Sequence, residues 1–267
     1  MLLLIVVALA IWRVTIFTEH RSMDRIREIG SSRINLYARS LKSSLEQFRH
    51  LPYVLARDSR IHGLLNNDFD AIRVNPHLED FGYTSSTLIF ILDAGGTTVA
   101  SSNWRSEQDL TGFNFSYRPY FKAAKENGFG GYYTVGYRTK QPGFFISCPV
   151  KKAGKFLGVV VVKVNLEQLQ QMWKDSGEDV IVSDAFGVLF LSSNDDWRYR
   201  SLRPLPQHTS KRLQEIQYQG FSLATLDIHR ESTEGGNILL LEDKKYLEQS
   251  LQLPQYGWRI HCECSLR

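Results

Sequence analysis

The sequence contains Ile91-Leu92-Asp93-Ala94-Gly95-Gly96 followed by Ser101-Ser102-Asn103, and nearly repeats it as Val182-Ser183-Asp184-Ala185-Phe186-Gly187 followed by Ser192-Ser193-Asn194. In both copies the glycine lies three residues after the aspartate, and the offset between the copies is a constant 91 residues. An apolar run, a turn with Asp and Gly, and a second short run are typical of a β-hairpin. The repeat therefore predicts two domains of one type.

The length and composition fit two globular domains. The chain has 267 residues, 43% apolar and 12% aromatic, enough to form packed cores in two domains of about 90 to 100 residues. The net charge is +4, and lysine and arginine are spread along the chain, so we expect no nucleic-acid partner. Cys148, Cys262 and Cys264 show no CxxC spacing, which favours buried thiols over a disulfide or a metal site.

Residues 1–18 form an apolar stretch that is interrupted by Arg13. The stretch is shorter than the roughly 20 residues that span a bilayer. We expect it to be a truncated membrane signal-anchor helix, because a long polar helical segment follows at once. Ala8-Leu9-Ala10 has the form of a cleavage site, so a secretory signal stays open, and a buried soluble helix is a third alternative.

Residues 19–74 are predicted to form a long helical stalk and packing helices. Between His20 and about Leu55, apolar residues recur at spacings of three to five, which predicts one long amphipathic helix. A second helix is expected from Leu51 to Asn67. The apolar stripe of the long helix must pack on its own domains or on the same helix of a second copy, so a homodimer through this helix is one hypothesis.

Residues 75–170 and 171–267 are predicted to form the two repeated domains. Each combines strand-like runs with short helices, and five strands with helices on one side are a PAS-like layout. The fold class is therefore α+β, a long N-terminal helix followed by two tandem PAS-like domains, each an antiparallel sheet of about five strands flanked by helices. The expected strands are 88–92, 97–100, 132–137, 143–150 and 157–164, then the hairpin 180–191, 237–241, 245–252 and 258–264. Short helices are expected at 120–126, 165–173 and 211–216.

Arg118 is the first candidate for chemistry. It lies in Phe115-Ser116-Tyr117-Arg118-Pro119-Tyr120-Phe121 and directly precedes the proline that starts a helix. Its guanidinium and the free N–H groups of the helix can converge on one anion, for which a carboxylate is well suited. Phe115, at the start of this stretch, is included in the candidate site. The alternative is a surface arginine whose stem packs on Tyr or Phe.

Lys163 is the second candidate. It interrupts the apolar strand from Gly158 to Val164, where an ammonium group must be paired, solvated or functional. By strand alternation it shares a face with Val159 and Val161. The alternative is that the strand lies at the sheet edge, where the lysine stays in water and prevents edge-to-edge pairing.

The remaining candidates lie on the neighbouring strand and on the strand and loop before Pro142. Phe145 and Ser147 share one face of their strand, and Tyr133, Tyr137 and Thr139 can offer hydroxyls to the same pocket. Two cations and several hydroxyls describe a receptor for a small dianion. The aromatic residues are equally compatible with a role in the core.

No catalytic constellation or metal-ligand spacing occurs in the sequence. The seven histidines are scattered, and there is no GxSxG elbow, Walker A loop or nucleotide-type GxGxxG. We therefore expect no catalytic residue, no metal and no cofactor in this segment, which argues against a secreted enzyme. A purely structural dimerisation module stays a further alternative, with Arg118 and Lys163 as surface charges.

Four segments carry a resemblance to a known family: Tyr-Arg-Pro-Tyr-Phe from Tyr117, the loop from Gly136 to Pro-Gly-Phe-Phe, Val-Val-Lys-Val ending at Val164, and Trp-Arg-Tyr-Arg-Ser-Leu from Trp197. Over nearly its whole length the chain resembles the extracytoplasmic sensor region of the DctB-type four-carbon dicarboxylate sensor histidine kinases. The resemblance implies tandem PAS (double Cache) domains between two membrane helices, with the membrane-distal domain, here 75–170, binding succinate, malate or fumarate.

The resemblance also implies residue roles and partners. Arg118 and Lys163 match the family's ligand arginine and lysine, one for each carboxylate, and Tyr137 and Thr139 match hydroxyls of a loop where Ser or Thr is more familiar. It implies a segment facing the periplasm of the bacterial inner membrane, ATP in a kinase module outside this segment, a response regulator and a dicarboxylate transporter. The same architecture feeding a chemoreceptor or a cyclase stays open. The second domain has no lysine matching Lys163, which suggests transmission rather than a second site.

Overall fold

The computed structural model describes residues 27–233, 236–241 and 244–265. Its contacts divide the chain into two compact units. Unit 1 holds residues 27–40, Gln170–Leu205 and the described residues from Leu223 onward, and unit 2 holds Leu41–Leu169 and Pro206–Ser222. Each unit is built around one antiparallel sheet, so the predicted α+β class is confirmed.

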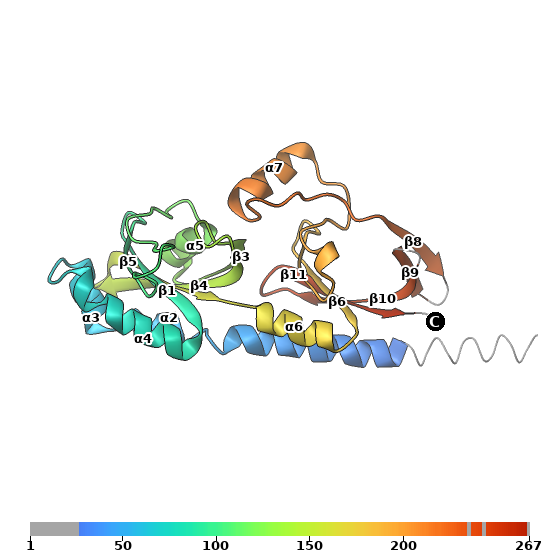
Figure 1. Cartoon of the computed structure of the whole chain (residues 1–267), viewed down its shortest axis with the longest axis horizontal. Helices are drawn as coiled ribbons and strands as arrows, with labels where there is room; N and C mark the ends of the chain where they lie inside the picture. Colours follow the sequence, from blue (N-terminus) through green and yellow to red (C-terminus); the bar gives the residue numbers. More distant parts are fainter. Residues whose placement is uncertain (1–26, 234–235, 242–243, 266–267) are drawn as a thin grey trace, which may run out of the picture. The chain divides into compact units, whose positions relative to one another are not determined.

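Unit 2 contains a five-stranded sheet with the strand order β2-β1-β5-β4-β3. One face is covered by α5 (Pro119–Asn127), and the other by α2 (Leu51–Leu55), α3 (Ser59–Leu65) and α4 (Asn75–Ser85) (Figure 1). The strands are β1 (Thr87–Asp93), β2 (Thr98–Ser101), β3 (Gly130–Val135), β4 (Pro142–Lys152) and β5 (Lys155–Val164). β5 is third in the strand order, so it is the central strand and has a neighbouring strand on each side.

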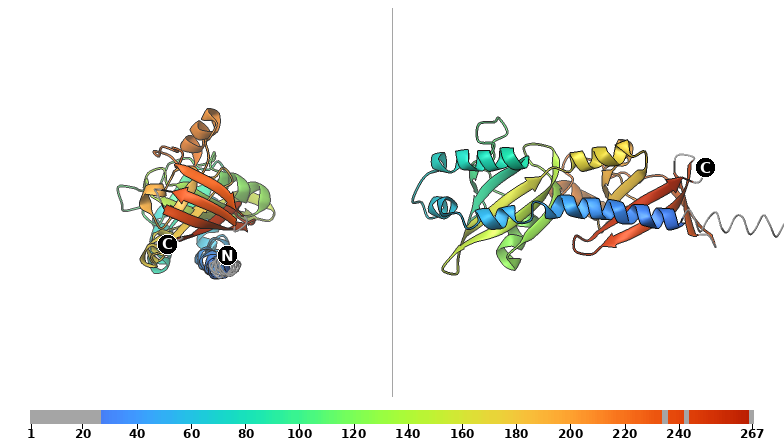
Figure 2. Two further views of the ribbon diagram at one scale, coloured as in Figure 1. Left: turned by 90° about the vertical axis from the view of Figure 1, so that its right-hand side faces the viewer. Right: turned by 90° about the horizontal axis from the view of Figure 1, so that it is seen from below.

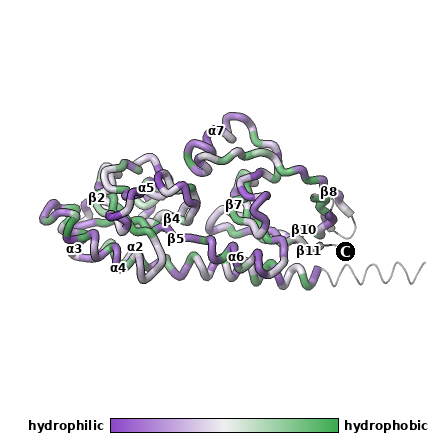
Figure 3. The backbone as a smooth tube through the Cα atoms, viewed as in Figure 1, coloured by the Kyte–Doolittle hydropathy of each residue, from purple (hydrophilic) through white to green (hydrophobic). Residues whose placement is uncertain are grey.

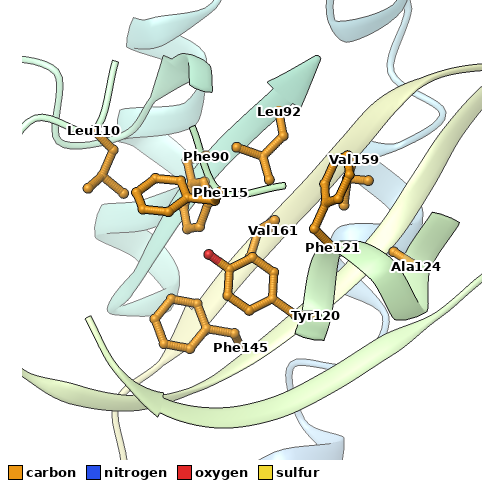
Figure 4. Packing of buried hydrophobic residues seen from close by; sticks show 10 residues of the cluster. All are labelled: Phe90, Leu92, Leu110, Phe115, Tyr120, Phe121, Ala124, Phe145, Val159 and Val161. Atoms are coloured by element: carbon orange, nitrogen blue, oxygen red, sulfur yellow. The ribbon is translucent and has the colours of Figure 1, made fainter. Parts of the chain in front are cut away.

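The sheet face beneath α5 carries an aromatic layer. Phe90 of β1 and Phe145 of β4 pack against Tyr120 of α5 (Figure 4). The rings of Tyr120 and Phe145 are stacked with centroids 5.1 Å apart, and the Ser147 hydroxyl donates to the Tyr120 carbonyl at 2.8 Å. Because each buried aromatic side chain contributes about 1.5–3 kcal/mol, this layer holds the first turn of α5 firmly on the sheet.

Unit 1 contains a six-stranded sheet with the order β7-β6-β11-β10-β9-β8. Residues 27–40 of the N-terminal helix and most of α6 (Glu167–Asp175) lie along one face of it (Figure 2). The Tyr37 and Trp173 rings meet edge to face at 6.0 Å, and the Trp173 indole donates to the Ser40 hydroxyl at 3.3 Å. The strands are β6 (Asp179–Ser183), β7 (Leu189–Ser192), β8 (Ile228–Thr233), β9 (Gly236–Leu241), β10 (Lys244–Leu253) and β11 (Trp258–Ser265).

The two repeated stretches form the same hairpin, β1–β2 in unit 2 and β6–β7 in unit 1. Asp93 and Asp184 each accept backbone N–H bonds at 2.8 and 2.9 Å from the residues two and four positions later. The glycine three residues after each aspartate has φ of 86°, a conformation that favours glycine. Ser102 and Ser193 each accept a backbone N–H of the preceding strand at 2.9 Å. The repeated hairpin is confirmed.

The N-terminal helices differ from their prediction. In the described part of the chain the first helix covers 27–46, and turns at 47–50 separate it from α2, so one continuous helix to Leu55 is not confirmed. The expected second helix is divided into α2 and α3 because Asp58 caps α3 by accepting the Arg60 N–H. The predicted anchor 1–18 lies outside the described residues, and none of the described helices is long and apolar enough to cross a membrane.

The second sheet has one strand more than about five. β8 (Ile228–Thr233) forms an edge strand paired only with β9 among the described strands. Its sequence, Ile-His-Arg-Glu-Ser-Thr, has no apolar alternation, because an edge strand with polar side chains buries little of its surface. Cys148 and Cys262 are buried and form no disulfide with each other, in agreement with the predicted buried thiols.

Pro206–Ser222, the return segment, packs within unit 2, whereas the chain on both sides of it belongs to unit 1. It contains α7 (Gln207–Ile216), which is mostly hydrophilic in Figure 3 and buries Leu213. After α7, the Gln217 carbonyl accepts the Val135 N–H at 2.9 Å, and Tyr218 is fully buried. The domain boundary predicted between residues 170 and 171 rests on the offset between the two repeats. This offset gives no information about a later segment that packs in the first of the two domains.

We expect Asp184→Ala to destabilise unit 1 by about 2–3 kcal/mol, because two backbone N–H groups lose a charged acceptor. Asp93→Ala should destabilise unit 2 by a similar amount, and Asp184→Asn, which keeps an oxygen at the same place, should lose less than half as much. Urea unfolding followed by tryptophan fluorescence measures these differences. An Asp184→Ala protein as stable as the wild type would contradict this role of the turn.

Candidate ligand-binding site

A small, partly open cavity with an enclosed volume of about 20 Å³ lies in unit 2, on the sheet face that carries α5. Arg118, Arg138 and Lys163 line it, and none of its lining residues is Asp, Glu, His or Cys. The cavity therefore has positive charge and no acid in its wall to neutralise it. Its lining residues are Leu88, Phe90, Leu110, Phe115, Arg118, Tyr120, Thr134, Gly136, Tyr137, Arg138, Thr139, Phe145 and Lys163.

Arg118 is buried, with 1% of its surface exposed. It is the N-cap residue of α5, and Pro119 is the first helical residue, as predicted. One terminal nitrogen, Nη1, donates to the Thr134 hydroxyl at 3.1 Å and to the Ile216 carbonyl at 2.5 Å. No carboxylate of the described residues forms an ion pair with Arg118. The alternative of a surface arginine is therefore wrong, and the buried guanidinium fits an anion.

Lys163 lies on the central strand, and only 6% of it is exposed, so the sheet-edge alternative is wrong. Its ammonium group donates to the Thr139 hydroxyl at 3.1 Å and lies 6.0 Å from the centre of the Phe145 ring. A Cβ at Gly143 would lie 2.7 Å from Cε of Lys163, so the glycine leaves room for the lysine stem. Burial lowers the pKa of Lys163 to about 8, and the negative charge of Glu167 opposes this shift.

The loop between β3 and β4 closes one side of the cavity. The Gly136 N–H donates to the Gln141 carbonyl at 2.9 Å, and the Lys140 N–H donates to the Gly136 carbonyl at 3.0 Å. This tight loop places Tyr137 and Thr139 in the cavity wall. The Tyr137 ring lies 6.5 Å from the Phe115 ring. The structure thus brings together six of the eight sequence candidates: Arg118, Lys163, Thr139, Tyr137, Phe145 and Phe115.

Two candidates lie outside the cavity. Tyr133 pairs with Phe144, so its side chain lies on the sheet face opposite to Phe145. Ser147 shares the face of Phe145, but its hydroxyl is buried and donates to the carbonyls of Tyr120 and Gly130. Ser147 therefore joins α5 to the sheet and does not line the cavity.

Thr134 and Arg138 line the cavity and were missed in the sequence. Thr134 pairs with Gly143, which is on the same face as Phe145. The two-residue alternation of β3 places Thr134 and Tyr133 on opposite faces of the sheet. Which of these faces lies toward the cavity is known only once β3 is paired with β4. The Arg138 guanidinium lies 4.8 Å from the centre of the Phe113 ring and donates to the Glu107 carbonyl. It is one of several loop cations, and no sequence pattern separates it from the rest.

The described part of unit 1 has no cation at the register that corresponds to Lys163. Lys163 pairs with Leu88 of β1, and the residues at the equivalent register of unit 1 are Glu263 and Asp179. The predicted absence of a lysine that matches Lys163 agrees with this register, and the role of the second domain in transmission stays a prediction.

The buried cations, the hydroxyls and the apolar walls can recognise a small molecule with a negative charge at each end. Phe90, Phe145 and Leu88 provide apolar surface on the cavity wall, and the polar groups are few and convergent, as in small-molecule sites. Two such units in tandem, one with a cavity lined by three cations, define the class of tandem PAS-like sensor regions.

The comparisons with known proteins agree with this class. The chain is 28% identical over 267 residues to the C4-dicarboxylate transport sensor protein DctB of Pseudomonas aeruginosa, covering 97% of this chain and 41% of the relative. The protein of the same name from Rhizobium meliloti is 30% identical over 244 residues, covering 86% and 39%. The chain thus spans about two fifths of the length of these curated relatives.

A solved structure extends the comparison to the fold. The crystal structure of the V. cholerae histidine kinase DctB sensor domain matches with a TM-score of 0.82 and 23% identity, covering 91% of this chain and 97% of that one. No family model matches the chain. The resemblance to DctB-type sensor regions is confirmed, and with it the arrangement of two antiparallel sheets flanked by helices.

We expect Lys163→Met to stabilise the ligand-free protein at about pH 7 by roughly 1–3 kcal/mol, since a shift of one pKa unit corresponds to about 1.4 kcal/mol. The lowered pKa of Lys163 means that the unfolded chain binds the extra proton above about pH 8, so the stability of the wild type rises with pH there. The difference between variant and wild type should therefore shrink at about pH 9.5.

Thermal unfolding at both pH values measures this difference. Lys122→Met, on the exposed part of α5, is the matched control and should change little at either pH. A Lys163→Met protein that is less stable than the wild type at about pH 7 would contradict the cost assigned to the buried ammonium.

Proposed function

We propose that this chain is the periplasmic sensor region of a two-component sensor histidine kinase and that its unit 2 binds four-carbon dicarboxylates such as succinate, malate or fumarate. The observation that carries the proposal is the pair of buried cations, Arg118 and Lys163, in one cavity whose wall contains no acid. The relatives named for C4-dicarboxylate transport sensing support the ligand class.

Each carboxylate of the ligand has its own partner in this proposal. Arg118 and the N–H groups of the first turn of α5 bind one carboxylate, because a guanidinium offers a bidentate fork and a helix N-terminus favours negative charge. Lys163, with the hydroxyls of Thr139 and Tyr137, binds the other. The aromatic layer contacts the carbon chain and excludes water, which strengthens both ion pairs.

The remaining parts of the proposal concern the longer protein. A membrane anchor in the bacterial inner membrane, a kinase module that uses ATP, a response regulator and a dicarboxylate transporter are proposed from the relationship to the DctB proteins. A homodimer through the N-terminal helix is supported by Ile29 and Leu36, which are 42% and 64% exposed. They are seven residues apart and therefore lie on one helix face.

Isothermal titration calorimetry with succinate tests the proposed ligand. Arg118→Ala and Lys163→Ala should each weaken binding by about 30-fold or more, because truncating one partner of a buried charge pair costs about 2–5 kcal/mol. Lys163→Ala should weaken succinate far more than butyrate, which has one carboxylate. Lys122→Ala, an exposed lysine of α5, should bind as the wild type does.

Two results would contradict the site. One is a wild type that binds no dicarboxylate, and the other is undiminished succinate binding by both alanine variants.

We expect the affinity for succinate to be nearly constant around pH 7 and to fall above about pH 8, by up to tenfold per pH unit. In the free protein Lys163 loses its proton near pH 8, whereas a bound carboxylate raises its pKa, so binding above this pH takes up a proton. Lys163→Arg, which stays charged, should remove this pH dependence. Calorimetry at several pH values measures it, and a flat profile for the wild type would contradict the assignment of Lys163.

A further inference from the structure

The return segment reaches the ligand arginine directly. Ile216 and Gln217 are 98 and 99 residues after Arg118 in the sequence, and the Ile216 carbonyl accepts a hydrogen bond from Nη1 of Arg118 at 2.5 Å. The Thr134 hydroxyl accepts from the same nitrogen at 3.1 Å and donates to the Gln217 carbonyl at 2.9 Å. One edge of the guanidinium is therefore fixed by backbone and hydroxyl groups.

The other edge of the guanidinium is left for the ligand. Among the described residues, Nε and Nη2 of Arg118 take part in no hydrogen bond. A carboxylate binds a guanidinium best through two parallel N–H bonds, and this edge offers such a pair. Arg118 can therefore bind a carboxylate and the Ile216 carbonyl at the same time.

Gln217 holds the return segment on β3. Its carbonyl accepts the Val135 N–H at 2.9 Å, on an edge strand of the sheet. The Tyr132 hydroxyl donates to Oε1 of Gln217 at 2.8 Å, and Nε2 donates to the Tyr218 hydroxyl at 2.9 Å. Gln217 is 6% exposed and is absent from the cavity wall, so its contacts serve the segment and not the ligand.

We infer that Gln217 is a positioning residue of the dicarboxylate site, and that a carboxylate on Arg118 tightens the docking of the return segment on β3. This inference rests on the proposed function. The docked segment fixes the guanidinium before the ligand arrives, which lowers the entropic cost of binding. By thermodynamic reciprocity, the ligand stabilises the docked segment by the same free energy.

The return segment is joined to unit 1 at both of its ends. Leu205 and Leu223, the residues on both sides of the return segment, belong to unit 1. Tighter docking of the segment therefore restrains the two points at which the chain enters and leaves unit 1. Binding of a carboxylate to Arg118 thus acts on a segment that is continuous in sequence with the chain of the second sheet.

Amide hydrogen exchange and succinate titration on the same variants test the inference. In the wild type, saturating succinate should slow exchange at the Val135 amide, which donates to Gln217, by about tenfold or more. Gln217→Leu should weaken succinate binding by about tenfold and abolish this slowing. Tyr132→Phe removes one hydroxyl, retains the ring and should weaken binding by about threefold, which covers the case of a Gln217→Leu protein that does not fold.

Gln219→Leu is the matched control, because this glutamine bonds only to the Glu215 carbonyl of its own helix end in the described structure. It should leave both affinity and exchange unchanged. If the wild type binds succinate through Arg118, but Val135 exchange is unaffected and the Gln217 and Tyr132 variants bind normally, this inference is overturned and the proposed function stands. If the wild type binds no dicarboxylate, both are overturned.

Discussion

Burying a charged group in a protein costs several kcal/mol of folding free energy unless an opposite charge or hydrogen bonds replace its water. Unit 2 buries two cations, Arg118 and Lys163. Lys163 lies in the central strand of the sheet, and Arg118 lies at the start of α5. The aromatic layer around Phe90, Tyr120 and Phe145 supplies the apolar burial that offsets this cost and holds the helix in place. The lowered pKa of Lys163 reflects the loss of hydration of its ammonium group on burial. In the proposed function, a dianion brings the two opposite charges.

The two repeated units share one hairpin but differ in the sheet face next to it. The turns of Asp93 and Asp184 have the same hydrogen bonds, at 2.8 and 2.9 Å in each turn. The sheet faces next to them differ: where Val161 packs beneath α5, unit 1 has His261, whose Nε2 lies 3.3 Å from the Ser183 hydroxyl. Burial lowers the pKa of His261 to about 4. The aromatic layer and its cations are thus a feature of unit 2, built on a hairpin that both units share.

Much of the fold followed from local patterns. The Asp-Gly turns, the proline that starts α5 and the apolar run of β5 depend on interactions between near neighbours, so they were visible in the sequence. The sequence is less informative where the pairing of strands or the capping of helices decides the structure. The sequence predicts Tyr133 and not Thr134 as a site residue, because the face on which each residue of β3 lies depends on the register of β3 with β4. The break at 47–50 and the polar edge strand β8 carry weak local signals.

By itself, the sequence determined the repeat, the α+β class and the two cations, because a guanidinium before a helix-starting proline and an ammonium in a run of valines are unusual wherever the chain places them. The tertiary structure decided that both line one cavity without an acid, that Ser147 joins α5 to the sheet, and that Ile216 and Gln217 contact Arg118 and Thr134. These contacts join residues 27 to 98 positions apart. They form only when strand register and the path of the chain are fixed, which no local pattern encodes.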